Sequence, residues 1–538
     1  MSAESPSGVL SGAPDERRCV SLWSLREDVL VDTSSTTGSV LLSGRWGEVR
    51  LRGVNSTVRE ALRRMSLGPI SLTNVAAELV PSGPERAPRG LSVGPSAGSK
   101  AEILMVLHRV QQMVVRSLTL EGADRLLLSA VPIAPAARCR PVPAGRRHPV
   151  RLSRFAFLRS EGKGFVLESP TSLYRMVLHG PEASWVVGML GLPATTEEIA
   201  AALPLSLQTV SEIIALLLAT GMAVPADSGE VGEEGKGQEN GHVPGPAAPC
   251  FAEDRDPALQ SWSAVDLLFH SRSTLGRHDA DFGATYPLAE RMPPAPAVKS
   301  LPDGPRIALP RPVLDEVVAG DPPLTTVLEE RRSIRSYGAS RLTAAALGEF
   351  LYRALRVRGL REHHGDGRPP DEYTDRPYPS GGRAYELEFY LTVRDCAGIP
   401  AGIHYYAPVE HCLVRIGDAE QETAVPERIE EARIVAGLAD PPSVVITITS
   451  RFHRLAWKYS GLAYALTLKH VGAVTQNLYL IATAMGLAPC ALGSGDVDLA
   501  ARTTGTDWRI EPGVGGFALG TRREERSPVP HRPSAIRT

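Results

Sequence analysis

One stretch of low apolar content divides this chain into two parts. Residues Asp227 to Pro249 are rich in Gly, Glu and Pro and contain few large apolar side chains. Such a composition cannot build a packed core and is typical of a flexible linker. The chain has 538 residues, of which 43% are hydrophobic, so each side of this stretch can form a core of its own. We therefore expect separate folded units, with a flexible linker over residues 226–255.

Charge and cysteine spacing exclude several classes of protein. The net charge of -2 gives no broad attraction to nucleic acid or to an anionic membrane. The six cysteines include no C-x-x-C pair, so neither a thiolate zinc site nor a disulfide framework is indicated, and we expect no metal. Met1 to Arg18 lacks the apolar core of a secretory signal. The longest apolar stretch, Leu462 to Leu487, contains Lys469 and His470 and is typical of a buried helix. These features predict a soluble, cytoplasmic protein.

The N-terminal half contains two segments with the same order of patterns. In the first, strand-like runs at Val29–Val31, Gly38–Ser43 and Gly47–Leu51 precede a helical stretch at Thr57–Met65. A second helix is predicted over Ala101–Leu118, because apolar residues recur there on one face at helical spacing.

The second segment repeats this plan. Phe155–Leu158 and Phe165–Leu167 flank a Gly-containing turn and predict a β-hairpin. Thr195 to Glu198 forms a capping box that opens a short helix. Residues Ser206 to Thr220 predict a second helix, which Gly221 closes.

These patterns predict winged-helix-like units over 1–125 and 154–225, joined by a basic linker over 126–153. DNA binding is disfavoured because Ser206 to Thr220 carries no Lys or Arg to contact phosphates and base edges. A sheet edge beside a helix can instead bind a peptide strand by β-augmentation. A purely structural or dimerisation role is an equal alternative, and the arginines of the linker are typical either of a solvated segment or of a site for an acidic peptide.

After the flexible linker, basic residues gather at the end of a helix-like run. They fall within five positions, as Arg331, Arg332, Ser333 and Arg335. Guanidinium groups and a hydroxyl this close suit one compact anion such as a phosphate, which they bind with paired, charge-assisted hydrogen bonds. The alternative is a basic helix end that interacts favourably with its own dipole.

Two glycine turns and three strands follow. Tyr378-Pro-Ser-Gly-Gly382 leaves backbone amides free for the close approach of a ligand. Leu492-Gly-Ser-Gly-Asp496 is a second glycine-rich loop. Apolar, β-branched runs predict strands at Leu387–Val393, Val444–Ile448 and Val514–Gly520.

Taken in order, six motifs resemble those of the SagB-type peptide-azoline dehydrogenases of the nitroreductase superfamily, and the resemblance covers residues 262–520. The motifs are Arg331-Arg-Ser-x-Arg335, Tyr378-Pro-Ser-Gly-Gly382, Trp457-Lys-Tyr459 with Tyr464, Gln476-Asn477, Gly486-Leu-Ala-Pro-Cys490 and Leu492-Gly-Ser-Gly495. The resemblance implies an α+β, nitroreductase-like FMN-binding domain, which we expect over 256–526, with a tail over 527–538. It also implies a homodimer with FMN at the subunit interface.

The resemblance assigns roles to individual residues. FMN phosphate and ribityl would be held by Arg331, Arg332, Ser333 and Arg335, together with Arg522 or Arg523. Pro379, Ser380 and Gly381 would approach the flavin from the partner subunit. Asn477 on the long helix would contribute to cofactor binding, and Gly493, Ser494 and Gly495 would lie against the isoalloxazine. Lys458 and Tyr459 match the catalytic Lys-Tyr pair of the family.

The Lys-Tyr pair suits the implied chemistry. Conversion of an azoline to an azole removes one hydride and one proton, so a flavin acceptor needs a protein base beside it. Free Lys and Tyr side chains titrate near pH 10, so proximity or burial must lower the pKa of one of them, and the sequence leaves open which. Without the resemblance, Trp457-Lys-Tyr459 is typical of a simple helix entry. The family pattern Leu-Tyr-His-Tyr is replaced by Ile403-His-Tyr-Tyr406, which leaves a role for His404 open and favours a structural one.

We therefore predict an FMN-dependent dehydrogenase that oxidises peptide thiazolines or oxazolines to thiazoles or oxazoles. Its partners would be an azoline-containing precursor peptide, made by ribosomes, and a separate cyclodehydratase. A flavin oxidase that acts on a carrier-bound azoline, or that carries out another peptide desaturation, is an alternative. A non-catalytic scaffold that binds partners through its N-terminal units is another.

Overall fold

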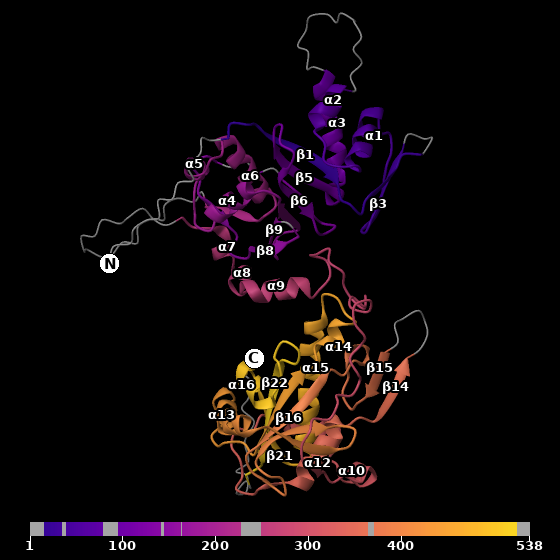
Figure 1. Cartoon of the computed structure of the whole chain (residues 1–538), viewed down its shortest axis with the longest axis vertical. Helices are drawn as coiled ribbons and strands as arrows, with labels where there is room; N and C mark the ends of the chain where they lie inside the picture. The colour runs from indigo at the N-terminus through magenta and orange to yellow at the C-terminus, as the bar shows by residue number, and fades with distance from the viewer. Residues whose placement is uncertain are drawn as a thin grey trace, which may run out of the picture. The chain divides into compact units, whose positions relative to one another are not determined.

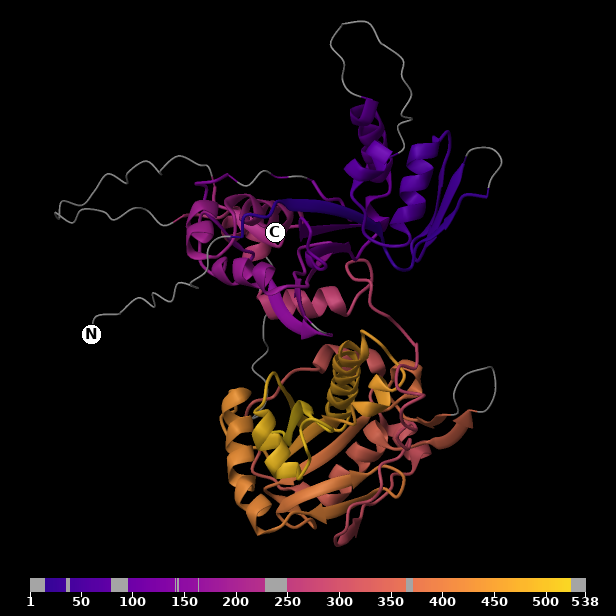
Figure 2. The same cartoon turned by 45° about the horizontal axis from the view of Figure 1, so that its top comes forward.

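The computed structural model describes residues 15–34, 39–78, 95–140, 142, 145–162, 164–227, 249–363 and 371–523. The chain divides into two compact units, Met1–Ala280 and Asp281–Thr538, which are indigo to pink and pink to yellow, respectively, in Figures 1 and 2. The second unit therefore begins 25 residues after the predicted start at 256. The predicted tail over 527–538 lies outside the described residues.

A single antiparallel sheet of six strands runs through most of the first unit, in the order β1-β5-β6-β10-β9-β8. Its strands are β1 (Cys19–Leu25), β5 (Val114–Leu120), β6 (Leu126–Pro132), β10 (Tyr174–Leu178), β9 (Gly164–Glu168) and β8 (Phe157–Glu161). Strands of both predicted N-terminal units thus share one sheet, and the boundary predicted after residue 125 falls inside the β5–β6 hairpin. The prediction of a linker over 126–153 is wrong for β6, because the backbone of this strand pairs with β5 on one side and with β10 on the other.

The helix predicted over Ala101–Leu118 is only half right. Helix α3 spans Pro95–Arg109, and a short 3-10 turn, η1 (Gln111–Met113), leads directly into β5. The residues after Met113 are rich in β-branched side chains, and pairing with β1 and β6 satisfies their backbone groups. Tertiary pairing therefore overrides the helical spacing that Val114 and Leu118 showed in the sequence.

A second, smaller sheet packs with three helices at the N-terminal end of this unit. Its order is β2-β3-β4, and its strands confirm the predicted runs to within two residues. The elements are β2 (Leu30–Asp32), β3 (Val40–Gly44), β4 (Gly47–Leu51), α1 (Ser56–Met65), α2 (Leu72–Glu78) and α3. Buried side chains such as Leu42, Leu62 and Ile103 form their common core.

The helices predicted in the second segment are confirmed. They are α5 (Thr196–Ala202) and α6 (Leu207–Ala219). A further helix, α4 (Pro181–Met189), was not predicted, and strands β7 (Val150–Leu152) and β11 (Ala223–Pro225) pair with each other. Thr195 and Glu198 form the capping box that opens α5. Ser206 caps α6, and Gly221 ends it with a φ of +74°.

Part of the predicted flexible linker is folded. Residues 228–248 lie outside the described residues, but Phe251 is buried and Ala226 forms a bridge to it. Glu253 accepts hydrogen bonds of 2.8 Å from both Arg151 and Ser153. Three short helices follow, α7 (Ala252–Arg255), α8 (Pro257–Gln260) and α9 (Ala264–Arg272). The segment from Phe251 onwards therefore belongs to the first unit.

The second unit is built on an antiparallel sheet of seven strands, in the order β12-β19-β18-β16-β20-β22-β21. The strands are β12 (Arg306–Ala308), β19 (Cys412–Ile416), β18 (Gly402–Ala407), β16 (Leu387–Val393), β20 (Val444–Ser450), β22 (Gly513–Thr521) and β21 (Leu487–Leu492). All seven residues of β16 and of β20 are buried. The three predicted strands are therefore confirmed as β16, β20 and β22, which are neighbours in the sheet.

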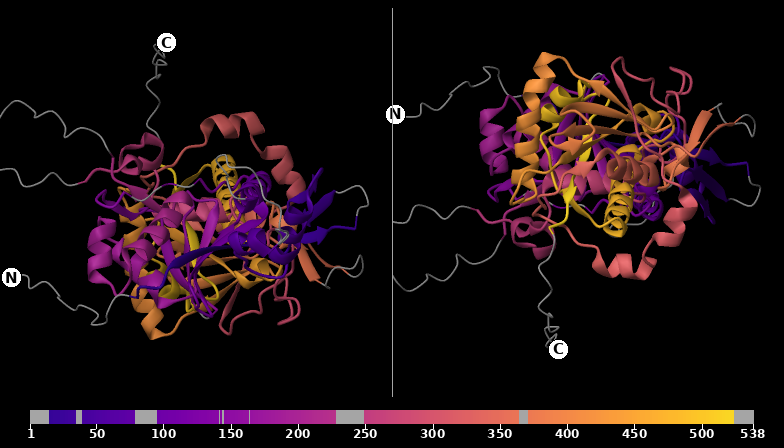
Figure 3. Two further views of the ribbon diagram at one scale, coloured as in Figure 1. Left: turned by 90° about the horizontal axis from the view of Figure 1, so that it is seen from above. Right: turned by 90° about the horizontal axis from the view of Figure 1, so that it is seen from below.

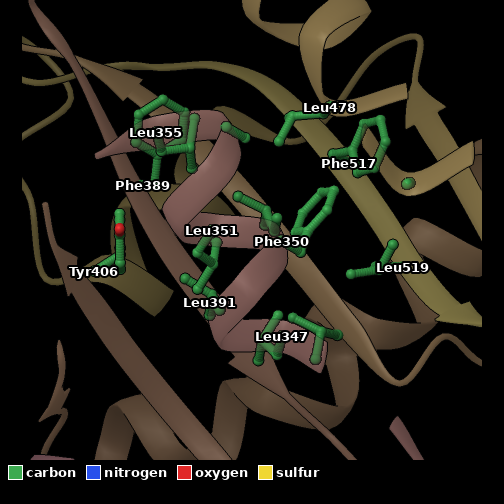
Figure 4. Packing of buried hydrophobic residues seen from close by; sticks show 14 of the residues in the cluster. Leu347, Phe350, Leu351, Leu355, Phe389, Leu391, Tyr406, Leu478, Phe517 and Leu519 are labelled. Atoms are coloured by element: carbon green, nitrogen blue, oxygen red, sulfur yellow. The ribbon is translucent and has the colours of Figure 1, made fainter. Parts of the chain in front are cut away.

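Helices cover both faces of this sheet, which gives the predicted α+β architecture. One face carries α12 (Ala344–Leu355) and α15 (Ala463–Ala484), whose apolar side chains pack on alternate residues of the central strands. Figure 4 shows Phe350 of α12 and Leu478 of α15 grouped with Phe389 and Phe517. The other face carries α13 (Ala419–Val435) and α16 (Val497–Thr504).

Short elements complete the second unit (Figures 1 and 3). They are α10 (Leu314–Gly320), α11 (Leu324–Glu330), α14 (His453–Ala456), the strand pairs β13 (Leu342–Thr343) with β17 (Cys396–Ala397) and β14 (Gly359–His363) with β15 (Asp371–Asp375), and the 3-10 turn η2 (Gly381–Arg383). In the described part of the chain, no helix is both long and apolar enough to span a membrane. The same residues contain no group of three His, Cys, Asp or Glu side chains arranged to hold a metal ion.

Candidate functional site

The predicted site residues gather mainly at one end of the seven-stranded sheet. β20 ends there at Ser450, which pairs with Leu387 at the start of β16. On the other side of β20, Thr449 pairs with Gly513 at the start of β22. β21 ends at Leu492 at the same end of the sheet, because Leu492 pairs with Gly516 near the start of β22. The loops that carry the two glycine turns and the Lys-Tyr pair therefore leave the sheet from the same end.

A cavity of about 290 Å³ opens at this end. Its floor is formed by backbone of the Gly493–Gly495 loop and of Gly513–Gly516, and its wall is formed by Tyr464, Val471 and Thr475 on one face of α15. A Cβ added at Gly493 would meet nothing within 4 Å, so this backbone faces open space. The cavity is close to the smallest size of ~300 Å³ that is usual for small-molecule sites. The predicted Gly493, Ser494 and Gly495 thus line a real cavity.

One cation in the cavity wall was not predicted from the sequence. Arg428 of α13 is only 2% exposed, and its Nε donates a 3.2 Å hydrogen bond to Thr447 of β20. Its guanidinium also forms an ion pair with Glu431, which in turn accepts a 2.6 Å hydrogen bond from the backbone N–H of Asp496. Arg428 therefore fixes the Gly493–Gly495 loop and places a positive charge against it. Its spacing in α13 gives no sequence signal for this role.

The Lys-Tyr pair meets the first glycine turn. Nζ of Lys458 donates a 3.3 Å hydrogen bond to the carbonyl oxygen of Gly382. A Cβ added at Gly382 would lie 2.9 Å from the same Nζ and would overlap the hydroxyl of Tyr459. Both side chains are half-buried. The two residues predicted to be catalytic are therefore brought together with the Pro379–Gly382 turn, although 76 residues separate Lys458 from Gly382.

Individual members of that turn have different surroundings. Pro379 is exposed, whereas Ser380 and Gly381 are half-buried. The hydroxyl of Ser380 accepts a 2.9 Å hydrogen bond from the backbone N–H of Tyr385, and the N–H of Gly381 donates a 2.6 Å bond to Nε2 of His470. His470 lies next to Val471 on α15. Adjoining residues of one helix therefore bond to the turn and line the cavity.

Arg331 and Ser333 lie beside the strand that leads into the second glycine loop. Ser333 shares a 2.7 Å hydrogen bond with the hydroxyl of Tyr479, which also accepts a 2.8 Å bond from the N–H of Ala491. The Arg331 guanidinium lies over the Tyr479 ring, 5.4 Å from its centroid. Ala491 is two residues before Gly493. Tyr479 therefore connects the start of the arginine segment, residues 331–335, to the Gly493–Gly495 loop.

The remaining arginines lie further along the sheet. The backbone of Gly338 bonds to Thr521 at the far end of β22, and Nε of Arg523 donates a 3.1 Å bond to the carbonyl of Tyr337. Nε of Arg335 donates a 2.8 Å bond to the carbonyl of Ala436. At ~3.3 Å per residue, the length of β22 puts this end roughly 25 Å from Gly513. The arginine segment therefore extends from the cavity end towards the opposite end.

Two features of these arginines bear on anion binding. Arg332 is exposed beside Arg331, so a ligand can reach it. Nε of Arg522 is buried and has no hydrogen-bond partner among the described residues. A buried guanidinium N–H without an acceptor is costly, and a bound phosphate or carboxylate would relieve that cost. The residues present thus fit an anionic group at the arginine segment and a flat group with polar edges at the cavity.

Asn477 is placed apart from the cavity. Its side-chain amide donates a 3.0 Å hydrogen bond to the carbonyl of Ala354 at the end of α12. Val471 and Thr475 line the cavity, and residue 477 is about 200° around the helix from residue 475 at 3.6 residues per turn. The contact that this structure gives to Asn477 is one between helices.

Two other residues from the motifs have structural contacts. Trp457 is buried, and its indole N–H donates a 2.8 Å bond to the carbonyl of Met292. His404 is fully buried in β18, and neither ring nitrogen has a partner among the described residues. Burial lowers the pKa of His404 to about 4, so its ring is neutral at physiological pH.

Two protein-family models match the chain. The one described as "Cyanobactin oxidase ThcOx" matches residues 150–279, within the first unit. The one described as "Nitroreductase family" matches residues 328–521, within the second.

Individual proteins are similar to the chain as well. A Methanocaldococcus jannaschii protein named "Putative nitroreductase MJ1384" is 32% identical over 171 residues, which is 32% of this chain and 78% of that protein. Among solved structures, a putative nitroreductase from Ralstonia eutropha JMP134 is 21% identical, with a TM-score of 0.31, and covers 44% of this chain and 100% of its own. The E. coli microcin synthetase McbBCD complex with truncated pro-MccB17 bound contains a chain that is 19% identical, with a TM-score of 0.31, and covers 48% and 93% respectively.

Proposed function

This chain belongs to the nitroreductase family, and on that premise we propose that it is an FMN-dependent dehydrogenase that oxidises azoline rings in a peptide to thiazoles or oxazoles. The observation that carries this proposal is the convergence of Lys458, Tyr459 and the Gly381–Gly382 turn at the sheet end where the cavity opens. An oxidoreductase that removes hydrogen from a carbon needs a base held beside its cofactor, and this arrangement provides one.

We propose that the cavity and the start of the arginine segment hold FMN. The glycine floor lets a flat ring approach the backbone closely, and the buried Arg428 offers a cation at its edge. Arg331, Arg332 and Ser333 would bind the phosphate and ribityl, with Arg522 or Arg523 further along the chain. Bound FMN would supply the hydride acceptor for the reaction.

The roles of the protein groups follow from the chemistry of the ring. Formation of the new C=C bond breaks two C–H bonds, one losing a hydride and the other a proton. The proton would pass to Lys458 or Tyr459, whose polar ends are both within contact range of Gly382. The turn would hold the Lys amine in place through the Gly382 carbonyl, and the half-buried setting of both side chains limits their hydration.

The substrate class is supported by the motif order and by the match of residues 150–279 to the cyanobactin oxidase model. We propose that the substrate is a ribosomally made precursor peptide whose azoline rings come from a separate cyclodehydratase, since an azoline must be formed before it can be oxidised. The first unit would contribute to peptide or partner binding, as its match to an oxidase family supports.

We further propose a homodimer. Two short helices of the second unit, α10 and α11, are close in sequence and expose apolar side chains. Val318 is 79% exposed and Leu324 is 65% exposed. Neighbouring apolar residues that are this exposed are typical of an interaction surface. A second copy could cover them and add to the FMN site.

The direct test is mass spectrometry of a synthetic thiazoline peptide incubated with the flavin-loaded protein. We expect the peptide to lose two hydrogen atoms, and we expect Lys458→Ala protein to leave it unchanged. A protein that binds no flavin after reconstitution, or a yellow protein that leaves every azoline peptide intact, would refute the proposal.

A further inference from the structure

A buried histidine and a buried glutamate lie behind the turn that Lys458 contacts. Nε2 of His470 accepts a 2.6 Å hydrogen bond from the N–H of Gly381. Nδ1 of the same ring is 2.8 Å from a carboxylate oxygen of Glu386. His470 is 5% exposed and Glu386 is not exposed at all. The pair sits outside the set of residues assigned to FMN or to proton removal.

The turn itself has an unusual backbone. Gly382 has a φ of +59°, and two residues that are not glycine also have positive φ, Arg383 at +57° and Tyr385 at +44°. Such conformations cost about 1 kcal/mol or more each for a residue with a side chain. They persist only where surrounding contacts determine the backbone, and such strain is concentrated at functional sites.

Backbone hydrogen bonds from Arg383 to Ser380 and from Ala384 to Gly381 supply part of that constraint, and four further contacts add to it. The Ser380 hydroxyl accepts from the N–H of Tyr385, and Nε of Arg454 donates a 2.7 Å bond to the carbonyl of Ala384. The N–H of Arg451 bonds to the carbonyl of Glu386. The fourth is the bond from Gly381 to His470, and Gly381 is directly followed by Gly382, whose carbonyl accepts from Lys458.

We propose that His470, held by Glu386, is a positioning residue for Lys458. By accepting the N–H of Gly381, the imidazole fixes the Gly381–Gly382 segment. The Gly382 carbonyl is then directed at the Lys458 amine, which is kept beside Tyr459. This inference rests on the proposed function, because that function assigns Lys458 a catalytic role.

Glu386 selects the state of the ring that this role needs. Nε2 can accept the Gly381 N–H only when it carries no proton itself. A carboxylate has only acceptor atoms, so its contact requires the proton of a neutral ring to be on Nδ1. The other neutral tautomer would point Nε2–H at the Gly381 N–H and a lone pair at the carboxylate. The glutamate thus determines which tautomer meets the turn.

The test measures the Lys458 amine without substrate or turnover. Full-length protein is labelled with trace acetic anhydride, and the acetylation rate of each lysine is read by mass spectrometry. Lys469 is the internal control, because it is exposed and adjoins His470 on α15. Four variants are compared with wild type: His470→Ala, His470→Leu, His470→Gln and Glu386→Gln.

In His470→Ala and His470→Leu we expect the Lys458 labelling rate to rise about fivefold, the factor that corresponds to loss of one ordinary hydrogen bond. The rate at Lys469 should not change. His470→Gln should stay close to wild type, since its side-chain oxygen can reach the position of Nε2. Glu386→Gln should fall between, because an amide can pair with either tautomer. Leu fills the volume of the ring without an acceptor, so it separates hydrogen bonding from packing.

Wild-type labelling at Lys458 in His470→Leu would overturn the proposal, as would equal effects of His470→Leu and His470→Gln. Should both His470→Ala and His470→Leu fail to fold, Glu386→Gln decides alone, and unchanged labelling in it contradicts the role of the pair. Turnover is measured in parallel, where the positioning role predicts a lower kcat with little change in KM. If wild-type protein oxidises azolines but the Lys458 labelling rate is the same in the His470 variants as in wild type, this inference fails and the proposed function stands. Altered labelling in a protein that turns over no azoline would do the reverse.

Discussion

Nζ of Lys458 donates a 3.3 Å hydrogen bond to the carbonyl oxygen of Gly382. This contact joins the segment after β20 to the segment before β16, which leave the sheet beside each other because Ser450 pairs with Leu387. It places the amine at a turn of strained backbone next to a second polar side chain, Tyr459. A lysine that served only as a solvated helix entry would need no such contact.

Lys458→Ala should keep bound flavin and lose turnover. The side chain contacts the Gly382 turn and holds the position expected of the base, and a positioned acid or base contributes about 10²–10⁴-fold to rate. The measurement is kcat on an azoline peptide alongside the visible spectrum. Lys469→Ala is the matched control, since Lys469 is exposed on α15, and it should retain wild-type kcat. Unchanged kcat in Lys458→Ala would remove this residue from the mechanism.

Gly382→Ala should lower turnover and stability together. The new Cβ would overlap the Tyr459 hydroxyl and approach Lys458 Nζ to 2.9 Å, at a φ of +59°. We expect a loss of about 1–2 kcal/mol in the free energy of unfolding from the left-handed backbone, measured by urea denaturation. Gly472→Ala on α15 is the control, because its Cβ would meet nothing within 4 Å, and a helical Gly→Ala change should stabilise by up to about 1 kcal/mol. Equal behaviour of the two variants would contradict the tight packing at the turn.

Arg331→Ala should weaken FMN binding more than Arg335→Ala. Arg331 is adjacent to the Tyr479–Ala491 contact that leads to the cavity loop, whereas Nε of Arg335 is already bonded to the carbonyl of Ala436. Loss of one charge-assisted hydrogen bond of about 1.5–3 kcal/mol corresponds to a rise in Kd of about 10-fold to 150-fold. Titration of flavin-free protein with FMN measures this. The opposite order of the two variants would place the phosphate at the far end of the segment.

The buried His404 predicts a pH dependence of stability. Its folded pKa is about 4, against about 6.5 in an unfolded chain. Between these values the unfolded state binds the proton and the folded state does not, so the free energy of unfolding falls as pH drops. This residue should account for about 2 kcal/mol lost between pH 7 and pH 5. His404→Leu should remove that share, because neither ring nitrogen has a partner to lose. The same loss between pH 7 and pH 5 in His404→Leu and wild type would show that another group titrates.

Local patterns determined much of the fold, and distant pairings determined the rest. The β-branched run Val444–Ile448 and the capping box at Thr195 were sufficient to predict their elements, because the responsible residues are neighbours in sequence. The helix predicted up to Leu118 was wrong, because pairing of β5 with β1, almost a hundred residues earlier, outweighs its spacing. The nitroreductase family was also predicted, from the order of six motifs, and the comparisons confirm it.

The candidate site divides in the same way. Lys458, Gly381 and Gly493 stand in recognisable motifs and were named from them. Arg428 and the His470–Glu386 pair were missed, because their partners are remote in sequence: Glu386 is 84 residues from His470. A single arginine in α13, or a histidine in an apolar helix, carries no local pattern. Only the folded sheet end brings them to the glycine turns.

The most direct measurement is the visible spectrum of the purified, flavin-loaded protein while it is mixed without oxygen with a thiazoline peptide. We expect the oxidised flavin bands to bleach, with one equivalent of flavin reduced for each thiazole formed, and Lys458→Ala protein to keep its colour. Wild-type protein that stays yellow with every azoline peptide, or that bleaches equally without Lys458, would contradict this expectation.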